Sequence, residues 1–144
     1  MINLSKWQER LKAARGEVPA DLVLSGGQVA CVYTGEWLQT DVALFDGVIV
    51  GLGDYAGPRL DIAGRYLLPG FIDGHLHLES SMLTPRELAR ALLPLGTTTV
   101  VADPHEIANV WGTQGLDFLL GASENLPLDF FFMLPSCGTL YVLI

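Results

Sequence analysis

The sequence predicts an α/β protein in which a small β-sheet module precedes βα units that build a parallel sheet. Residues 21–68 contain short apolar runs separated by glycine-containing turns, as in a small β module. Three apolar, β-prone runs follow, separated by helical patterns, and this alternation is typical of βαβ units. With 144 residues, half of them apolar, the chain is long enough to form a domain with a hydrophobic core.

Three consecutive parts are expected along the chain. They are an N-terminal helix in 1–19, the β-sheet module in 20–68 and the βα region in 69–144. Within the first part, Leu4, Trp7, Leu11 and Ala14 have helical spacing, which predicts an amphipathic helix over 4–15. We expect it to dock through this stripe, with a functional arm as the alternative. Gly16 is expected to end it.

The β module is predicted to be a small antiparallel sheet. Asp46-Gly47 lies between two apolar runs and is a strong signal for a two-residue hairpin turn. Gly26-Gly27 is expected to turn one strand into the next in the same way. The predicted strands are 22–24, 29–33, 42–45, 48–52, 60–62 and 66–68.

The βα region begins after Pro69. A first strand leads into His75 and His77, a second is expected at 97–102 and a third at 129–134. Between the first two strands, Thr84 is a predicted N-cap, followed by Pro85 at the first helical position and by Glu87.

Leucine and alanine spacing identifies the faces of the two helices in this region that should be buried. The first helix is expected to bury a stripe and to end at Gly96, and a second is expected from about residue 113. The predicted buried residues are Leu88, Ala91, Leu92 and Leu95 in the first helix, and Leu116, Leu119 and Leu120 in the second.

Composition and charge exclude several classes of protein. A net charge of −8 argues against nucleic-acid binding, because no excess of basic residues is available to displace phosphate counterions. There is no signal-peptide pattern and no uninterrupted apolar run of the ~20 residues that a membrane span needs, so we expect a cytoplasmic protein. Cys31 and Cys137 lack a paired spacing and are expected to be buried free thiols.

The most informative stretch for function lies at 70–79. On a strand, Asp73, His75, His77 and Glu79 would share one face, with Leu76 and Leu78 on the other. Two imidazoles at positions i and i+2 can converge on one metal ion, with carboxylates as further ligands or partners. The alternative is a pair of surface histidines on an edge strand.

All three histidines of the chain follow predicted strands, at their C-terminal ends. This is the edge at which (β/α) barrels and open α/β sheets place their active sites. We therefore expect His75, His77 and His105 to gather there.

The stretch 69–79, placed after a small β module, resembles the first barrel strand of the amidohydrolase superfamily. Segments further along resemble the bacterial adenine deaminase family within it, and the stretch from Asp103 to Val110, Asp-Pro-His-Glu-Ile-Ala-Asn-Val, is more specific than His-x-His alone. The other segments that carry the resemblance are 80–85, 96–102 and 131–137.

The resemblance implies a metal-dependent (β/α)₈ barrel that hydrolyses adenine to hypoxanthine and ammonia. It implies His75 and His77 as metal ligands, with Mn²⁺ as the expected divalent ion and Fe²⁺ or Zn²⁺ as alternatives. Glu79, His105 and Glu106 are the catalytic candidates. Glu79 could be a metal ligand, a base that orients water, or a residue that hydrogen-bonds to a metal ligand. Asp103 is the candidate for substrate binding, and a place around the metal's ligands is the alternative for Asp103, His105 and Glu106. For residues 103–106 a turn held by Pro104, with Asp103 as a helix cap, is the structural alternative.

Such a barrel takes roughly 250 residues, whereas only about 75 follow Pro69, enough for the first three βα units. We therefore expect the N-terminal part of an adenine deaminase, with an incomplete barrel that is inactive alone. Two alternatives are another amidohydrolase that acts on cyclic amides, as dihydroorotases and hydantoinases do, and a non-catalytic α/β module. The family implies a homo-oligomeric parent enzyme. The isolated chain is expected to self-associate through the open edge of strand 129–134 and the apolar segment 140–144.

Overall fold

The computed structural model describes residues 4–134. The chain separates into two units, Met1–Pro69 and Gly70–Ile144, which are described in turn. Cys137 and the segment 140–144, for which predictions were made, lie outside the described residues. Among residues 4–134, no helix combines the length and the apolar character that a membrane crossing requires.

The first unit begins with helix α1 (Leu4–Ala14), as the helical spacing predicted. Gly16, at φ +72°, follows its end. The predicted docking stripe is wrong, because Leu4, Trp7 and Leu11 are all more than half exposed. The helix is attached instead by buried Ala13 and by polar contacts.

Several polar contacts fix α1 to the β module, and most of them involve Asp46. Arg10 Nε donates to Asp46 Oδ2 at 3.0 Å, and Tyr55 Oη donates to the carbonyl of Ala14 at 2.8 Å. Partial desolvation raises the pKa of Asp46, but the Arg10 guanidinium and the Lys6 ammonium outweigh it and hold that pKa below its ordinary value. The helix is therefore positioned by ion pairs and hydrogen bonds as well as by apolar burial.

The β module contains seven strands in two sheets. The four-stranded sheet has the order β5-β4-β1-β6, and the three-stranded sheet has the order β3-β2-β7. The strands are β1 (Leu22–Ser25), β2 (Gln28–Ala30), β3 (Trp37–Gln39), β4 (Val42–Phe45), β5 (Val48–Leu52), β6 (Arg59–Asp61) and β7 (Tyr66–Leu67).

The hairpin predicted at Asp46-Gly47 is confirmed. It joins antiparallel β4 and β5, and both turn residues have positive φ, 49° and 73°, as a type I′ turn requires. The expected pairing of the first two strands across Gly26-Gly27 is wrong. β1 is hydrogen-bonded to β4 on one side and to β6 on the other, so no edge is left for β2, and the chain passes into the second sheet.

The β module is therefore mixed and not purely antiparallel. β1 pairs with β6 in parallel, and β2 pairs with β7 in parallel. Strand β3 was not predicted. Cys31 is free, but it is only partly buried because it follows the end of β2. Hydrogen bonds from the side chain and backbone of Thr34 lower the pKa of its thiol.

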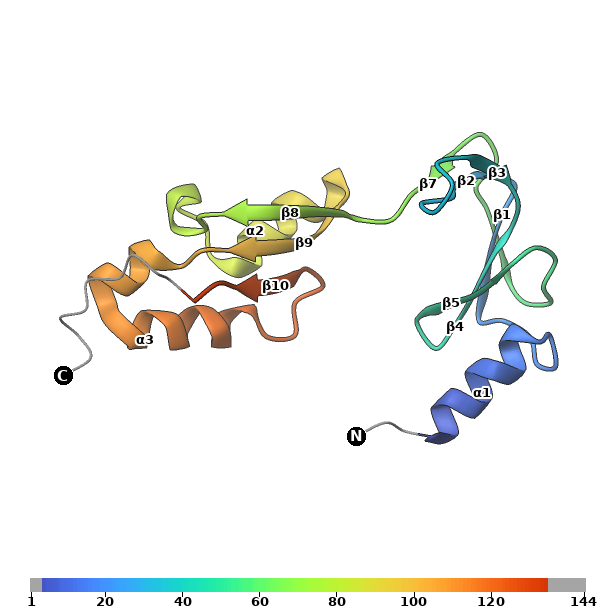
Figure 1. Cartoon of the computed structure of the whole chain (residues 1–144), viewed down its shortest axis with the longest axis horizontal. Helices are drawn as coiled ribbons and strands as arrows, with labels where there is room; N and C mark the ends of the chain where they lie inside the picture. The colour runs from blue at the N-terminus through green and yellow to red at the C-terminus, as the bar shows by residue number, and fades with distance from the viewer. Residues whose placement is uncertain (1–3, 135–144) are drawn as a thin grey trace. The chain divides into compact units, whose positions relative to one another are not determined.

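The second unit contains the parallel sheet that the βα pattern predicted. Its strands are β8 (Phe71–Leu76), β9 (Thr97–Ala102) and β10 (Asp129–Phe132), in the order β10-β9-β8. β9 is central and pairs in parallel with both neighbours (Figure 1). The carboxyl ends of the three strands consequently lie at one edge of the sheet.

Helix α2 (Pro85–Leu92) connects β8 to β9, and its predicted cap is confirmed. The hydroxyl of Thr84 accepts from the backbone N–H of Glu87 at 3.4 Å. Its buried face consists of Pro85, Leu88, Ala89 and half-buried Leu92, the i, i+3, i+4, i+7 pattern. The predicted burial of Ala91 and Leu95 is wrong. Ala91 lies off this stripe, and the 3₁₀ turn Leu93–Leu95 breaks the helical period.

Helix α3 (His105–Ser123) begins eight residues before the predicted start at residue 113. Gly112, at φ 62° and ψ −148°, interrupts it, and the part after this break corresponds to the predicted helix. Of its predicted buried residues, Leu119 is buried, Leu116 is half-buried and Leu120 is exposed. The unpredicted first part carries His105 and Glu106, so both lie in the first turn of a helix.

Both helices pack on the same face of the parallel sheet. Leu78, Leu88 and Leu119 form one buried cluster, against which Leu76 and Phe130 of the sheet pack. Ala89, Val100 and Leu128 form a second. Elsewhere in the sheet, Phe71, Ile72 and Phe131 are each more than half exposed.

Candidate metal centre

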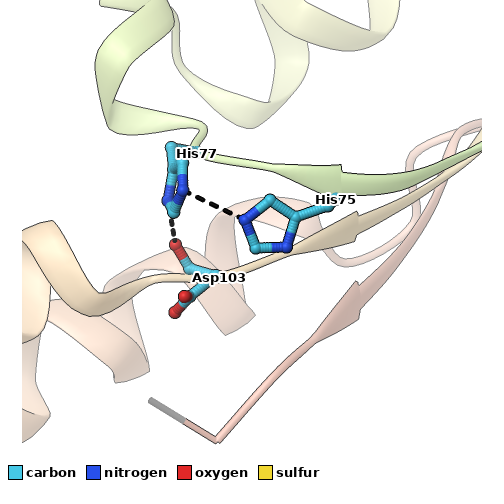
Figure 2. A group of neighbouring side chains, drawn as sticks. All are labelled: His75, His77 and Asp103. Carbon is cyan, nitrogen blue, oxygen red and sulfur yellow. Dashed lines mark hydrogen bonds between the residues drawn. The ribbon is translucent and has the colours of Figure 1, made fainter. Parts of the chain in front are cut away.

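Two imidazoles meet where β8 ends. His75 is on β8 and His77 follows its last residue, Leu76. Their Nε2 atoms are 3.1 Å apart (Figure 2). Two nitrogens bound to one ion at about 2.1 Å would be separated by a similar distance. The i, i+2 spacing therefore brings both rings to one point, as the sequence predicted.

The second ring nitrogen of His77 fixes its tautomer. Nδ1 lies 3.2 Å from the backbone carbonyl of Asp103, as Figure 2 shows. Because a carbonyl oxygen only accepts, Nδ1 carries the proton in this hydrogen bond and Nε2 keeps its lone pair. A histidine that binds a metal is commonly held in this way.

Strand register places Asp103 beside His77. Leu76 of β8 pairs with Ala102 of β9, and the N–H of Asp103 donates to the carbonyl of Leu76 at 2.9 Å. Ligand atoms of His75, His77 and Asp103 lie within 4.8 Å of one another. Asp103 Oδ1 is buried, without a hydrogen-bond partner among the described residues. The sequence predicted this residue for substrate, but its position also suits metal binding.

The third histidine lies on the other side of His77. The ring centroids of His77 and His105 are 4.7 Å apart, and His105 Nδ1 is 3.2 Å from Asp103 Oδ2. His77, His105 and Glu106 form a second group whose ligand atoms lie within 4.8 Å of one another. The three histidines thus gather at one sheet edge, and His77 is common to both groups.

The alternation predicted from Asp73 to Glu79 does not hold over its whole length, because the pairing of β8 with β9 shifts register between Asp73 and Leu76 and Glu79 lies beyond the strand. Asp73 Oδ1 accepts from the N–H of His75 at 3.1 Å. β8 ends at Leu76, so Glu79 lies in the 3₁₀ turn Glu79–Ser81 instead of on the strand. Its Oε1 accepts from the N–H of Ile107 at 3.0 Å. Strand periodicity cannot describe a residue that lies beyond the end of the strand.

Asp103 does not cap the next helix, contrary to the structural alternative for residues 103–106. The N-cap position of α3 is Pro104, and no side-chain cap comes from it. In the first turn of α3, Glu106 Oε1 accepts from Ser80 Oγ at 2.7 Å. Ser80 was not among the residues predicted for the site. The signal that could have indicated Ser80 is its position three residues after His77, in the turn that follows the His-x-His strand.

The donor set fits a divalent transition-metal ion. It combines imidazole nitrogens, one with its tautomer set by a backbone carbonyl, with carboxylates, and such mixed sites suit Zn²⁺, Fe²⁺ or Mn²⁺. Ligation would also explain the buried, unpartnered Oδ1 of Asp103, which is one of three such atoms in the described residues, together with Glu79 Oε2 and His105 Nδ1. Within residues 4–134, the site therefore offers part of a coordination sphere.

The histidine cluster lies at the carboxyl edge of a parallel sheet, which is where (β/α) barrels place their active sites. The sequence profile of the Amidohydrolase family matches residues 66–140, and the chain belongs to this family.

Within that family the chain is similar to bacterial adenine deaminases. It is 53% identical over 136 residues to the adenine deaminase of Bacillus subtilis strain 168, covering 94% of this chain and 24% of the relative. It is 54% identical over 129 residues to that of Bacillus licheniformis, covering 89% and 22%. The chain thus spans about a quarter of the length of these curated relatives.

Solved structures of D-aminoacylase share the fold. One, described as a study of the binuclear metal centre of that enzyme, matches with a TM-score of 0.63 and 25% identity, over 81% of this chain and 30% of that one. A second D-aminoacylase structure, described as defining a novel subset of amidohydrolases, matches with a TM-score of 0.60. The mixed α/β architecture therefore has known counterparts in this family.

Proposed function

We propose that the chain forms the N-terminal quarter of an adenine deaminase, which hydrolyses adenine to hypoxanthine and ammonia. The observation that carries the proposal is the identity of about half of all residues to curated adenine deaminases over nearly the whole chain. The three parallel strands would be the first three of a (β/α)₈ barrel. The D-aminoacylase likeness supports the same family architecture.

In this proposal, His75 and His77 hold a divalent metal ion, with Asp103 as an additional ligand or as a contact to substrate. When bound, the ion would supply a polarised water near neutral pH. Mn²⁺ is our choice of ion, and Fe²⁺ or Zn²⁺ would suit the same donors. The Asp103 carbonyl would keep His77 in the tautomer whose Nε2 is free to bind.

His105 and Glu106 are the proposed proton-handling groups of this chain. Both lie in the first turn of α3, where His105 is near Asp103 and Glu106 is hydrogen-bonded to Ser80. Deamination of a purine needs a proton delivered to the departing amine, and an imidazole or a carboxyl group can deliver it. The remaining ligands and acid–base groups would come from the other three quarters of the enzyme.

A chimaera tests the proposal. This chain would replace the matching N-terminal segment of the Bacillus subtilis adenine deaminase, and conversion of adenine would be followed by the appearance of hypoxanthine and ammonia. We expect Mn²⁺-dependent deamination in the chimaera and none in the 144-residue chain alone. A folded, Mn²⁺-loaded chimaera that leaves adenine untouched but hydrolyses cyclic amides would favour the other amidohydrolase class.

A further inference from the structure

We propose that Glu79 is a positioning residue that caps helix α3 from outside the helix and thereby sets His105 and Glu106 against His77. The proposal rests on the proposed function only in that it concerns the same site. It assigns to Glu79 a role different from that of base or metal ligand.

Helix α3 lacks a cap of its own. The first backbone N–H groups of a helix have no partner within the helix, and an N-cap side chain normally accepts from the second or third of them. Here the N-cap is Pro104, whose ring offers no acceptor. Ile107 is the third helical residue, and its N–H donates to Glu79 Oε1 at 3.0 Å. Glu79 therefore occupies the acceptor position of a missing N-cap side chain.

The charge of Glu79 suits the same role. The N-terminus of a helix carries partial positive charge, so a carboxylate there is stabilised by both the hydrogen bond and the dipole. The neighbouring residue adds a second link, because Ser80 Oγ donates to Glu106 Oε1 at 2.7 Å. Two consecutive residues of one turn thus contact the first turn of α3.

The turn that presents Glu79 is itself fixed. Leu78 is buried against Leu88 and Leu119, and the hydroxyl of Ser81 donates to the Leu78 carbonyl at 2.6 Å. Met82 at φ 57° then ends the turn. The backbone that carries this carboxylate is therefore held by packing and by a hydrogen bond, which is the support that a positioning group needs.

The contact between Glu79 and Ile107 helps to set the position of His105 relative to His77. Glu79 is two residues after His77, and Ile107 is two residues after His105. Two contacts join the segment that carries His77 to the segment that carries His105. The hydrogen bond from His77 Nδ1 to the Asp103 carbonyl lies before His105 in the sequence, and the hydrogen bond from the Ile107 N–H to Glu79 lies after it. Together they hold the His105 ring at 4.7 Å from that of His77. Neither group of possible ligands found within residues 4–134 includes Glu79.

The test compares Glu79→Gln with Glu79→Ala in the 144-residue chain. An amide oxygen can still accept from Ile107 but cannot act as a base or replace an anionic ligand well. We expect Glu79→Gln to keep most of the hydrogen-exchange protection of the Ile107 amide, whereas Glu79→Ala lowers it about fivefold to tenfold. The matched control, Glu87→Ala, removes the same charge from the first turn of α2. It should change neither the protection of the Ile107 amide nor the affinity for Mn²⁺.

Titration with Mn²⁺ alone gives the second readout. We expect Glu79→Ala to weaken Mn²⁺ binding about 10- to 100-fold, as loss of outer partners commonly does, and Glu79→Gln to restore most of it. Mn²⁺ binding in Glu79→Gln as weak as in Glu79→Ala would overturn the proposal in favour of a ligand or base. An unchanged Ile107 amide in Glu79→Ala would overturn it too. If Glu79→Ala fails to fold, Glu79→Gln is compared with the wild type. Wild-type-like protection of the Ile107 amide and Mn²⁺ affinity support the cap, whereas a large loss of Mn²⁺ affinity overturns it.

The two proposals fail in different ways. A folded wild-type Bacillus subtilis chimaera that binds no Mn²⁺ would contradict the metal centre, whereas protection of the Ile107 amide needs no metal and would still report the cap. In the Bacillus subtilis chimaera, a cap requires Glu79→Gln to retain the pH profile of deamination with a moderate loss of kcat/KM. A changed profile would overturn the cap.

Discussion

At the scale of single residues, the site depends most on His77. Its Nε2 faces His75, its Nδ1 is bound to the Asp103 carbonyl, and its ring lies against that of His105. It is also the only residue shared by the two possible ligand groups within the described part of the chain. The three histidines are consequently not equivalent.

His77→Ala should therefore impair metal binding more than His75→Ala. Loss of His77 disrupts both groups, whereas loss of His75 leaves His77, His105 and Glu106 together. Loss of a residue that only hydrogen-bonds to a metal ligand commonly weakens metal affinity about 10- to 100-fold. We expect the affinity of the chain for Mn²⁺ to fall by more than this in His77→Ala, because a ligand itself is removed. Titration followed by electron paramagnetic resonance measures it. Equal losses in the two variants, or full metal occupancy in His77→Ala, would contradict this ranking.

At the scale of elements, local sequence signals decided where α2 and the β4–β5 hairpin turn begin, whereas packing decided which face of a helix is buried. Thr84-Pro85 begins α2 where predicted, and Asp46-Gly47 forms the predicted hairpin turn. The face of α2 was only partly predicted, because Leu95 falls in a 3₁₀ turn after the helix. Thr84 is the element boundary that a single substitution can test.

Thr84→Ala should lower the free energy of unfolding of the second unit by about 0.5–2 kcal/mol, the usual cost of losing an N-cap. The hydroxyl that accepts from the Glu87 N–H is lost, and this N–H has no other partner within the helix. Thr84→Ser keeps the hydroxyl and is the matched control. Denaturant unfolding measures both, and equal stability of Thr84→Ala and Thr84→Ser would show that the cap contributes nothing.

At the scale of the whole molecule, the parallel sheet has an open edge. Within the described residues, β10 pairs only with β9, and its Phe131 is 59% exposed. Leu134, just after the strand, is 92% exposed. An unpaired apolar edge recruits other chains.

We therefore expect the purified 144-residue chain to self-associate, and Phe131→Lys to reduce the association, because charge on an edge strand opposes strand pairing. Tyr33→Lys introduces the same charge at a 95% exposed aromatic residue of the first unit and serves as the control. Size-exclusion chromatography with light scattering measures the mass. A wild-type chain that stays monomeric on concentration would refute the expectation.

The sequence by itself determined the features that depend on local spacing and turn chemistry. These are the three parallel strands, the cap of α2, the Asp46-Gly47 hairpin and the convergence of His75 with His77. Each follows from a fixed backbone period or from the conformation that one or two residues allow.

Only the tertiary structure decided which distant residues join the site. The register of β8 on β9 places Asp103 beside His77, and the turn after β8 brings Glu79 to Ile107, 28 residues away in sequence. It likewise decided that β1 takes β4 and β6 as neighbours, which sends β2 into another sheet. The physical reason is that hydrogen-bond partners of strand edges and helix ends are chosen by packing, and no local period of the sequence encodes that choice.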